Sequence, residues 1–395
     1  MMARKIVTIQ RSKENRAEQR DPVAGMAKTA IFSGLAAAEK MLRASARKPL
    51  AGTRNFLLLQ YPTALGTAVH ATPMIPALRA AVPECRIAVA ASGMALELFR
   101  NNPGVECLIE TPSPLTDLGG AIRSLRRQMP FGGERFVALT TKGNERTRIG
   151  IAALMCGAGA RVGFSEVPEI YRSVVQNDPQ RSMIDNNLRI VEAFGSPFRH
   201  FEPQSFAGES ERNWARRTLA DGGLREGQML AVFVTQTSPA QRKSWRPERF
   251  QAAARHMIER HGAKIVFVGT AVESEAIDAL RAGLGESTIS VSGKTSLLQL
   301  CALLSQCRVG LTLDTGILHL GRTVGLPMAI IAPAWSPPIE WLPVGDPRYR
   351  ILKNAEMAEA TPEYVIDEVS VDEVTRALDD LVAHYPAGAA ADLRG

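Results

Sequence analysis

The residues best placed for chemistry lie in the segment LTLDTGILH, which spans Leu311–His319. The apolar run up to Leu313 predicts a strand, and Asp314, Thr315 and Gly316 follow it as the turn into a helix. The free backbone N–H groups and the positive dipole end of such a helix suit a diphosphate. Asp314 would then accept hydrogen bonds from sugar hydroxyls, and Thr315 would donate one. The alternative is that Asp314 or Thr315 merely caps the helix.

A second polar segment follows the predicted strand Met229–Val234. It contains Thr235 and Thr237, and Lys243 stands shortly before a predicted helix that begins at Pro247. A lysine and an aromatic residue just beyond a strand end suit an anionic nucleotide. An exposed lysine is usually a solvated charge. Lys243 is a candidate binding residue only because it lies beyond a strand of the same domain.

A third segment, LGTAVHATP at Leu65–Pro73, follows the first predicted strand of the chain. Gly66 opens a predicted helix over Gly66–Ala81, and Thr67 and His70 share one face of it at a spacing of three. A single histidine is more often structural than functional, and the same holds for His319.

The elements that would position these segments alternate between strand and helix from Asn55 onward. Such alternation predicts α/β architecture with doubly wound parallel sheets, whose ligands bind beyond the carboxyl ends of strands. Pro197, Pro203 and Gly222–Gly223 interrupt the rhythm, so we expect two similar domains that face each other across a cleft. The expected divisions are a tail over 1–53, a first domain over 54–205, a second over 206–360, and a segment over 361–395 whose helix returns to the first domain.

Composition excludes several classes of protein. The chain has 395 residues, of which 45% are apolar and 22% charged, as in ordinary globular proteins. No apolar run approaches the roughly 20 residues that span a bilayer. The five cysteines form no CxxC pair and no metal-ligand spacing, which favours a reducing cytoplasm. A P-loop is excluded because Thr288 stands where the first glycine before Gly293–Thr295 would have to be.

The formal charge of +7 is confined to the N-terminal tail. Residues 1–53 carry eleven Lys/Arg and four Asp/Glu, so the remaining residues sum to zero. This distribution disfavours nucleic acid as a partner and suits contact with an anionic lipid surface. Ile31, Leu35, Ala38 and Leu42 recur at helical spacing and predict a short amphipathic helix. That helix would lie on a membrane surface or pack on its own domain, and the alternative is that the segment is a disordered extension.

Together these segments resemble glycosyltransferase family 9, the ADP-heptose:lipopolysaccharide heptosyltransferases, over roughly residues 55–384. The resemblance rests on LGTAVHATP at 65–73, RVGF at 161–164, KSW at 243–245, GKTSL at 293–297, and DTG at 314–316 with HL at 319–320. It implies a GT-B-like fold and inverting sugar transfer from an ADP-sugar, with no cofactor and no required metal.

The resemblance also implies roles for single residues. Lys243 would hold the diphosphate, together with the Thr315 hydroxyl and the backbone N–H of Gly316. Asp314 would contact the donor sugar, and His319 would line or brace the turn. An acidic residue would meet the adenosine ribose, and Glu273 and Glu275 are the two candidates in this chain.

One position departs from the family pattern. Where the family has an aspartate that deprotonates the acceptor hydroxyl, this chain has Thr67, and a threonine hydroxyl is no general base at neutral pH. His70 is the nearest titratable replacement, about one helical turn further on. Three explanations stay open: another group supplies the base, the acceptor is different, or turnover is poor.

The function expected from these observations is inverting transfer of a heptose-like sugar to lipopolysaccharide or another cell-envelope glycan. The protein would be cytoplasmic, with peripheral contact at the inner membrane. A catalytically impaired nucleotide-sugar-binding or scaffold protein of the same fold is the alternative, because of Thr67. A nucleotide-sugar epimerase of similar architecture is a third possibility.

Overall fold

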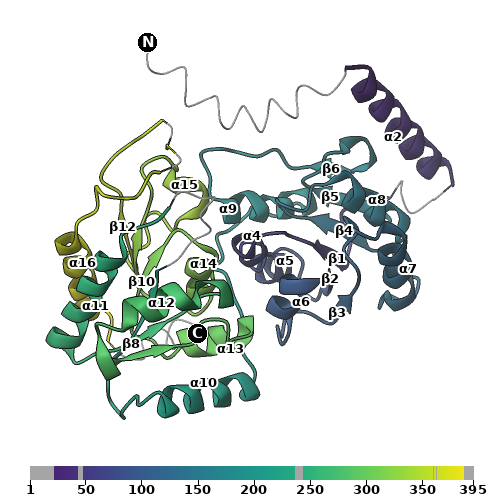
Figure 1. The fold of residues 1–395 in the computed structure, drawn as a ribbon. Helices are drawn as coiled ribbons and strands as arrows, with labels where there is room; N and C mark the ends of the chain where they lie inside the picture. The colour runs from purple at the N-terminus through teal and green to yellow at the C-terminus, as the bar shows by residue number, and fades with distance from the viewer. Residues whose placement is uncertain (1–21, 43–47, 236–242, 359, 362, 387–395) are drawn as a thin grey trace. The chain divides into compact units, whose positions relative to one another are not determined.

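The computed structural model describes residues 22–42, 48–235, 243–358, 360–361 and 363–386. The chain forms two compact units, unit 1 (Met1–Pro203) and unit 2 (Gln204–Gly395), which are coloured from purple to teal and from teal to yellow in Figure 1. The boundary predicted from the sequence lies two residues further along the chain.

Unit 1 contains one parallel sheet of six strands in the order β3-β2-β1-β4-β5-β6. The strands are β1 Asn55–Gln60, β2 Arg86–Ala91, β3 Cys107–Glu110, β4 Val137–Thr140, β5 Ala160–Gly163 and β6 Ser173–Val174. The helices after α2 are α4 Leu65–Val69, α5 Met74–Ala81, α6 Gly93–Phe99, α7 Leu118–Gln128, α8 Thr147–Met155 and α9 Met183–Leu188, with 3₁₀ turns η1 Pro168–Ile170 and η2 Arg189–Phe194.

Unit 2 repeats this plan with the strand order β12-β11-β10-β7-β8-β9. Its strands are β7 Leu230–Val234, β8 Lys264–Phe267, β9 Thr288–Ser290, β10 Val309–Leu313, β11 Met328–Ile331 and β12 Tyr349–Leu352. Its helices are α10 Glu209–Asp221, α11 Pro247–His261, α12 Ser274–Arg281, α13 Leu297–Leu304, α14 Gly316–Thr323, α15 Pro338–Trp341 and α16 Val371–His384, with 3₁₀ turns η4 Ala271–Glu273 and η5 Gly285–Ser287. Both sheets confirm the predicted doubly wound α/β architecture.

The central strands are buried on both faces, which is why they read as continuous apolar runs. Every residue of β1, β7 and β10 is buried. In unit 2 the ring of Trp245 packs edge-on against Phe250 at a centroid distance of 4.8 Å, and its indole N–H donates to the carbonyl of Val369 at 3.0 Å. These contacts fasten the chain just after Lys243 to the core beneath α11.

Two predicted helices differ from the structure. The helix expected over Gly66–Ala81 is divided into α4 and α5, because Pro73 lacks the N–H that a continuous helix needs. The C-terminal helix α16 packs on α11, β10, β11 and β12 of unit 2, where Leu378 and Leu381 enter the core. The predicted C-terminal helix thus belongs to unit 2, because its apolar face completes the cover of the second sheet.

Helix α2 (Pro22–Leu42) confirms the predicted N-terminal helix, but a different face of it packs. Phe32 is buried against Leu154, Val167 and Ile170 of unit 1. The predicted apolar stripe faces solvent instead, with exposed fractions of 62% at Ile31, 44% at Leu35 and 84% at Leu42.

Polar contacts explain why α2 packs this way. Glu39 forms a buried ion pair with Arg161, whose Nη1 donates to Glu39 Oε1 at 2.9 Å. Lys28 Nζ donates to the Thr147 hydroxyl at 3.0 Å and to the carbonyl of Glu166 at 2.9 Å. Neither Glu39 nor Lys28 belongs to the predicted apolar stripe. A charge buried without a partner is costly, so Arg161 favours the docked face that brings Glu39 to it. No helix among the described residues is long and apolar enough to cross a membrane.

Candidate functional site

The carboxyl ends of β7 and β10 bring two of the predicted segments together in unit 2. These strands are neighbours in the sheet, with Val234 paired to Thr312. Thr235 therefore follows β7 at the same edge where Asp314 and Thr315 follow β10. This is the edge at which open parallel sheets bind ligands. Thr237 lies outside the described residues.

Lys243 reaches this edge and forms an ion pair with Asp314. Its Nζ lies 2.6 Å from Asp314 Oδ2, and the two side chains are only 13% and 5% exposed. The ammonium group also lies 5.6 Å from the ring centroid of Trp335. Lys243 is therefore not a solvated surface charge, and its position fits the predicted anion site.

Thr315 begins α14 without capping it. Its backbone is extended at the N-cap position (φ −137°, ψ 172°), yet its side chain makes no capping hydrogen bond. The carboxylate of Asp314 is directed to Lys243 instead. The plain helix-cap alternative is therefore wrong. The first residue of α14 is Gly316, so the N–H groups of this helix end remain available to a ligand.

Within the described parts of the chain nine buried side-chain atoms lack a hydrogen-bond partner, and two of them are hydroxyl groups at this edge. They belong to Thr315 and Thr235. A buried polar atom that lacks a partner costs about 1–3 kcal/mol. Native proteins keep few such atoms, and those they keep commonly mark a place where a ligand or water binds. Their position beside the Lys243–Asp314 pair makes this edge the candidate polar site of unit 2.

His319 lies one helical turn beyond Thr315 and is 3% exposed. Burial lowers its pKa to about 3, although the nearby Asp314 carboxylate acts in the opposite direction. The imidazole is consequently neutral near pH 7. Its ring lies 6.0 Å from that of Trp341, measured between centroids. These contacts fit a residue that braces the turn.

The predicted ribose-binding residues lie beyond β8, the neighbour of β7. Glu273 Oε2 accepts a hydrogen bond from the N–H of Thr270 at 2.6 Å and completes a capping box there. Glu275 is exposed on α12. Of the two candidates, only Glu273 is held in place by a hydrogen bond to its own loop.

In unit 1, Thr67 lies at the carboxyl edge of the first sheet and is 8% exposed. It faces Gly143, which follows the neighbouring strand β4 and has a φ of +88°. A Cβ atom at Gly143 would lie 2.2 Å from the Thr67 methyl carbon, so only glycine fits there. The N–H of Gly143 donates to Glu145 Oε2 at 2.5 Å. The carboxylate of Glu145 is thus held next to the loop that covers Thr67.

His70 follows α4 and is only 1% exposed. Its carbonyl accepts a hydrogen bond from Asn187 Nδ2 at 3.0 Å. Although His70 is near Thr67 in sequence, its imidazole is closed off from solvent in this structure. A dissolved acceptor would not reach it without a rearrangement.

Sequence reasoning missed Glu145 and the two tryptophans. Trp335 and Trp341 follow β11, which neighbours β10 at the same carboxyl edge. The segment AWSPP after a predicted strand was a usable signal, because the loops after strands are where ligands bind. Glu145 likewise follows the predicted strand that became β4.

Comparison with known proteins gives one family match. The model of glycosyltransferase family 9 (heptosyltransferase) matches residues 150–362, which is more than half of the chain. No curated protein sequence matches.

Several solved structures share the fold. The family 9 glycosyl transferase from Veillonella parvula DSM 2008 is 20% identical with a TM-score of 0.74, over 86% of this chain and 99% of that chain. ADP-heptose lps heptosyltransferase II of E. coli is 19% identical with a TM-score of 0.67, over 83% of this chain and 98% of that chain. The E. coli heptosyltransferase WaaC, solved with ADP-2-deoxy-2-fluoro heptose, is 13% identical with a TM-score of 0.61, over 82% of this chain and 99% of that chain.

These structures confirm the GT-B-like arrangement of two six-stranded parallel sheets. At such identities they show the fold alone, whereas the family model extends across most of unit 2, including Lys243, Asp314 and Thr315. The chain belongs to glycosyltransferase family 9, the heptosyltransferase family.

Proposed function

We propose that this glycosyltransferase moves a heptose-like sugar, with inversion, from an ADP-sugar to lipopolysaccharide or another cell-envelope glycan. Unit 2 holds the donor and unit 1 the acceptor. The observation that carries the proposal is the group at the carboxyl edge of β7 and β10: a buried Lys243–Asp314 pair beside two hydroxyls that lack partners. A related enzyme, WaaC, was solved with an ADP-heptose analogue, which supports the choice of donor.

In the proposed reaction an acceptor hydroxyl attacks the anomeric carbon from the face opposite the diphosphate. The new glycosidic bond forms as the bond to the diphosphate oxygen breaks, and ADP leaves with the electron pair. Lys243, the Thr315 hydroxyl and the N–H of Gly316 stabilise the negative charge that develops on the diphosphate. Asp314 orients Lys243 and contacts the donor sugar. Because Lys243 and the α14 N-terminus neutralise this charge, we expect transfer without a divalent cation.

The proton of the acceptor hydroxyl needs a base, and Thr67 cannot supply one. We propose Glu145, whose carboxylate is fixed by the N–H of Gly143 next to Thr67. Glu145 is partly exposed, whereas the imidazole of His70 is buried. A carboxylate in this place would perform the work of the family's aspartate from the neighbouring loop.

Contact with the inner membrane surface fits the N-terminal segment. Helix α2 packs through one face, and its exposed stripe of Ile31, Leu35 and Leu42 lies on another. Residues 1–53 carry all of the excess positive charge. An anionic lipid surface matches both the charge and the apolar stripe. We therefore propose a cytoplasmic protein that binds this surface, where its glycolipid acceptor is displayed.

The decisive experiment combines turnover with binding. Purified protein is incubated with ADP-heptose and a heptose-deficient lipopolysaccharide, and released ADP and glycosylated product are measured by coupled assay and mass spectrometry. We expect stoichiometric ADP and product. Tight binding of ADP-heptose with neither ADP nor product, over a panel of acceptors, would instead establish the scaffold alternative. Transfer from a UDP-sugar but not from the ADP-sugar would overturn the donor assignment.

A further inference from the structure

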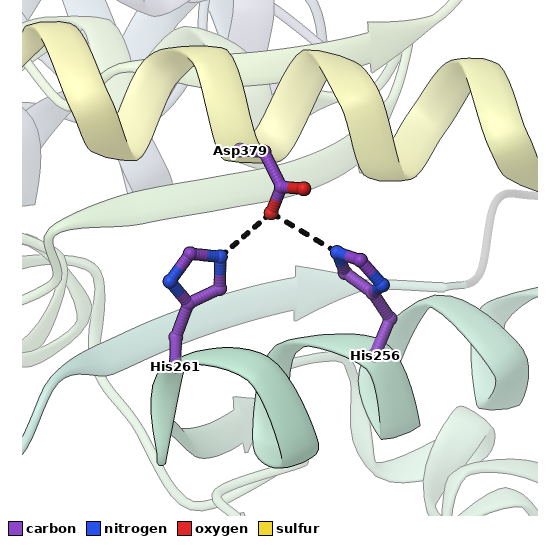
Figure 2. A group of neighbouring side chains, drawn as sticks. All are labelled: His256, His261 and Asp379. Carbon is purple, nitrogen blue, oxygen red and sulfur yellow. Dashed lines mark hydrogen bonds and ion pairs between the residues drawn. The ribbon is translucent and has the colours of Figure 1, made fainter.

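Two histidines and an aspartate converge on one point between α11 and α16. Figure 2 shows His256 and His261 rising from α11 toward Asp379, which descends from α16 between them. The Nε2 atom of His256 lies 3.0 Å from Asp379 Oδ1, and that of His261 lies 2.6 Å from the same oxygen. All three possible ligand atoms lie within 4.8 Å of one another.

This cluster is separate from the donor site. His261 ends α11 and precedes β8, which begins at Lys264, so it lies at the amino end of the parallel strands. The donor site lies at their carboxyl end, where α11 begins at Pro247. A helix of 15 residues is about 22 Å long. The cluster therefore has no part in the proposed transfer reaction.

The donor set suits a late first-row transition metal. Imidazole nitrogen and carboxylate oxygen bind Zn²⁺ at about 2.0–2.2 Å, and a tetrahedral ion holds its ligands a little over 3 Å apart. The side chains are between 19% and 29% exposed, which leaves one side open for a water ligand. Mg²⁺ and Ca²⁺ prefer sites built from oxygen alone and would bind poorly here.

The arrangement differs from ordinary histidine–carboxylate pairing elsewhere in the chain. His200 directs Nδ1 to Asp185 and Nε2 to Glu202, so its two contacts point apart. At the cluster, two Nε2 atoms instead share one carboxylate oxygen. The second oxygen of Asp379 contacts Arg260 at 3.2 Å, but Arg260 is 63% exposed and can turn into solvent.

We propose that His256, His261 and Asp379 form a structural site for a divalent transition metal, with Zn²⁺ as the representative ion, which fastens α16 to α11. Metal binding links two helices that are about 120 residues apart in the chain and that pack on the same core. The ion stabilises unit 2 because it binds the folded arrangement only.

Full-length protein treated with a chelator is titrated with Zn²⁺ by calorimetry and with Co²⁺ by visible absorption. Mg²⁺ serves as the negative control. We expect one Zn²⁺ per chain, tetrahedral Co²⁺ bands and a rise in Tm with Zn²⁺. His261→Gln keeps a hydrogen-bond donor for Asp379 but is a poor metal ligand, so this variant should fold and bind Zn²⁺ at least tenfold more weakly. His256→Gln and Asp379→Asn should behave likewise.

Matched controls use histidines outside the cluster. His200→Gln and His384→Gln should retain the wild-type affinity and the Zn²⁺-dependent rise in Tm. Arg260→Gln should bind Zn²⁺ more tightly, because it removes a cation that competes for Asp379. The absence of a stoichiometric site in the wild type would overturn the proposal. So would wild-type affinity in His261→Gln and His256→Gln, since the ion would then be bound elsewhere.

Discussion

The Nζ atom of Lys243 lies 2.6 Å from Oδ2 of Asp314, across 71 positions of sequence, with both side chains largely buried. This pair joins the segment after β7 to the turn after β10. It places a positive charge at the entrance of α14, where two hydroxyls lack partners. Groups from two segments that are far apart in sequence thereby become one candidate polar site.

Replacing Lys243 tests the charge at this site. Lys243→Met should lower the transfer rate about 10²- to 10³-fold, by analogy with the loss of a preorganised oxyanion donor. The variant should also lose stability, because Asp314 stays buried without its partner. The double variant Lys243→Met/Asp314→Asn should regain stability in urea unfolding and remain slow in ADP release.

Lys264→Met is the matched control, because Lys264 is also buried, donates to the carbonyl of Glu286, and lies at the amino end of β8, away from the proposed site. It should transfer at the wild-type rate. A Lys243→Met enzyme that keeps the wild-type rate would remove Lys243 from the mechanism.

Replacing Thr315 by valine should affect stability and binding in opposite directions. The Thr315 hydroxyl is buried without a partner, so Thr315→Val should raise the free energy of unfolding by about 1 kcal/mol. If that hydroxyl binds the diphosphate, the affinity for ADP should fall roughly 5- to 10-fold. Calorimetry with ADP and urea unfolding measure the two effects.

Thr312→Val provides the comparison, since the Thr312 hydroxyl donates to the carbonyl of Leu313 at 2.8 Å. That variant should lose stability and keep its affinity for ADP. Equal ADP affinity in Thr315→Val and the wild type would show that the hydroxyl does not touch the ligand.

The identity of the base is tested at Glu145. Glu145→Gln should reduce kcat about 10²- to 10⁴-fold and leave ADP affinity unchanged. Adding Thr67→Asp should restore part of the rate, because it puts a carboxylate where Thr67 faces Gly143. A full rate in Glu145→Gln, together with a large loss of kcat in a folded His70→Gln enzyme, would assign the base to His70 instead.

His319 makes the stability of unit 2 depend on pH. Burial holds its pKa at about 3 in the folded protein, below the ordinary value of 6.5. Between these two values the unfolded chain binds the proton and the folded protein does not, so stability falls as the pH drops from 6.5 toward 3. His319→Gln should flatten this part of the curve of unfolding free energy against pH.

His200 should have the opposite effect. Hydrogen bonds to Asp185 and then Glu202 raise its pKa to about 9, against the opposing effect of burial. Its contribution is therefore complete below pH 6.5 and is lost as the pH rises toward 9. Urea unfolding of His200→Gln at pH 6 and pH 9 should differ from the wild type mainly at pH 6. An equal difference at both pH values would contradict the assignment.

The proposed membrane contact depends on the exposed stripe of α2. Ile31→Ser/Leu35→Ser should reduce sedimentation with anionic phospholipid vesicles severalfold, and added salt should weaken the wild-type interaction. Val344→Ser, which changes an exposed apolar residue of unit 2, should bind as the wild type does. Removal of α2 is an unsuitable test, because it also removes the carboxylate partner of Arg161 and uncovers the apolar residues under Phe32.

Local sequence patterns determined the fold class of this protein and the position of the turn into α14. Apolar runs and helix periodicity sufficed to predict two doubly wound sheets. The reason is that the apolar pattern of a buried strand or helix lies within one continuous stretch of residues. The segment DTG after a predicted strand located the turn into α14 for the same reason. The family resemblance also rested on short segments in a fixed order.

Tertiary structure alone decided which distant side chains meet. The pairing of Lys243 with Asp314, the burial of His70, the packed face of α2, and the convergence of His256 and His261 on Asp379 all join segments far apart in the chain. Helical periodicity predicts the apolar face of a helix, but it does not predict which charged side chain forms a buried ion pair. In α2 the docked face carries both Phe32, which packs on unit 1, and Glu39, which pairs with the buried Arg161, and both contacts depend on residues more than 100 positions further along the chain.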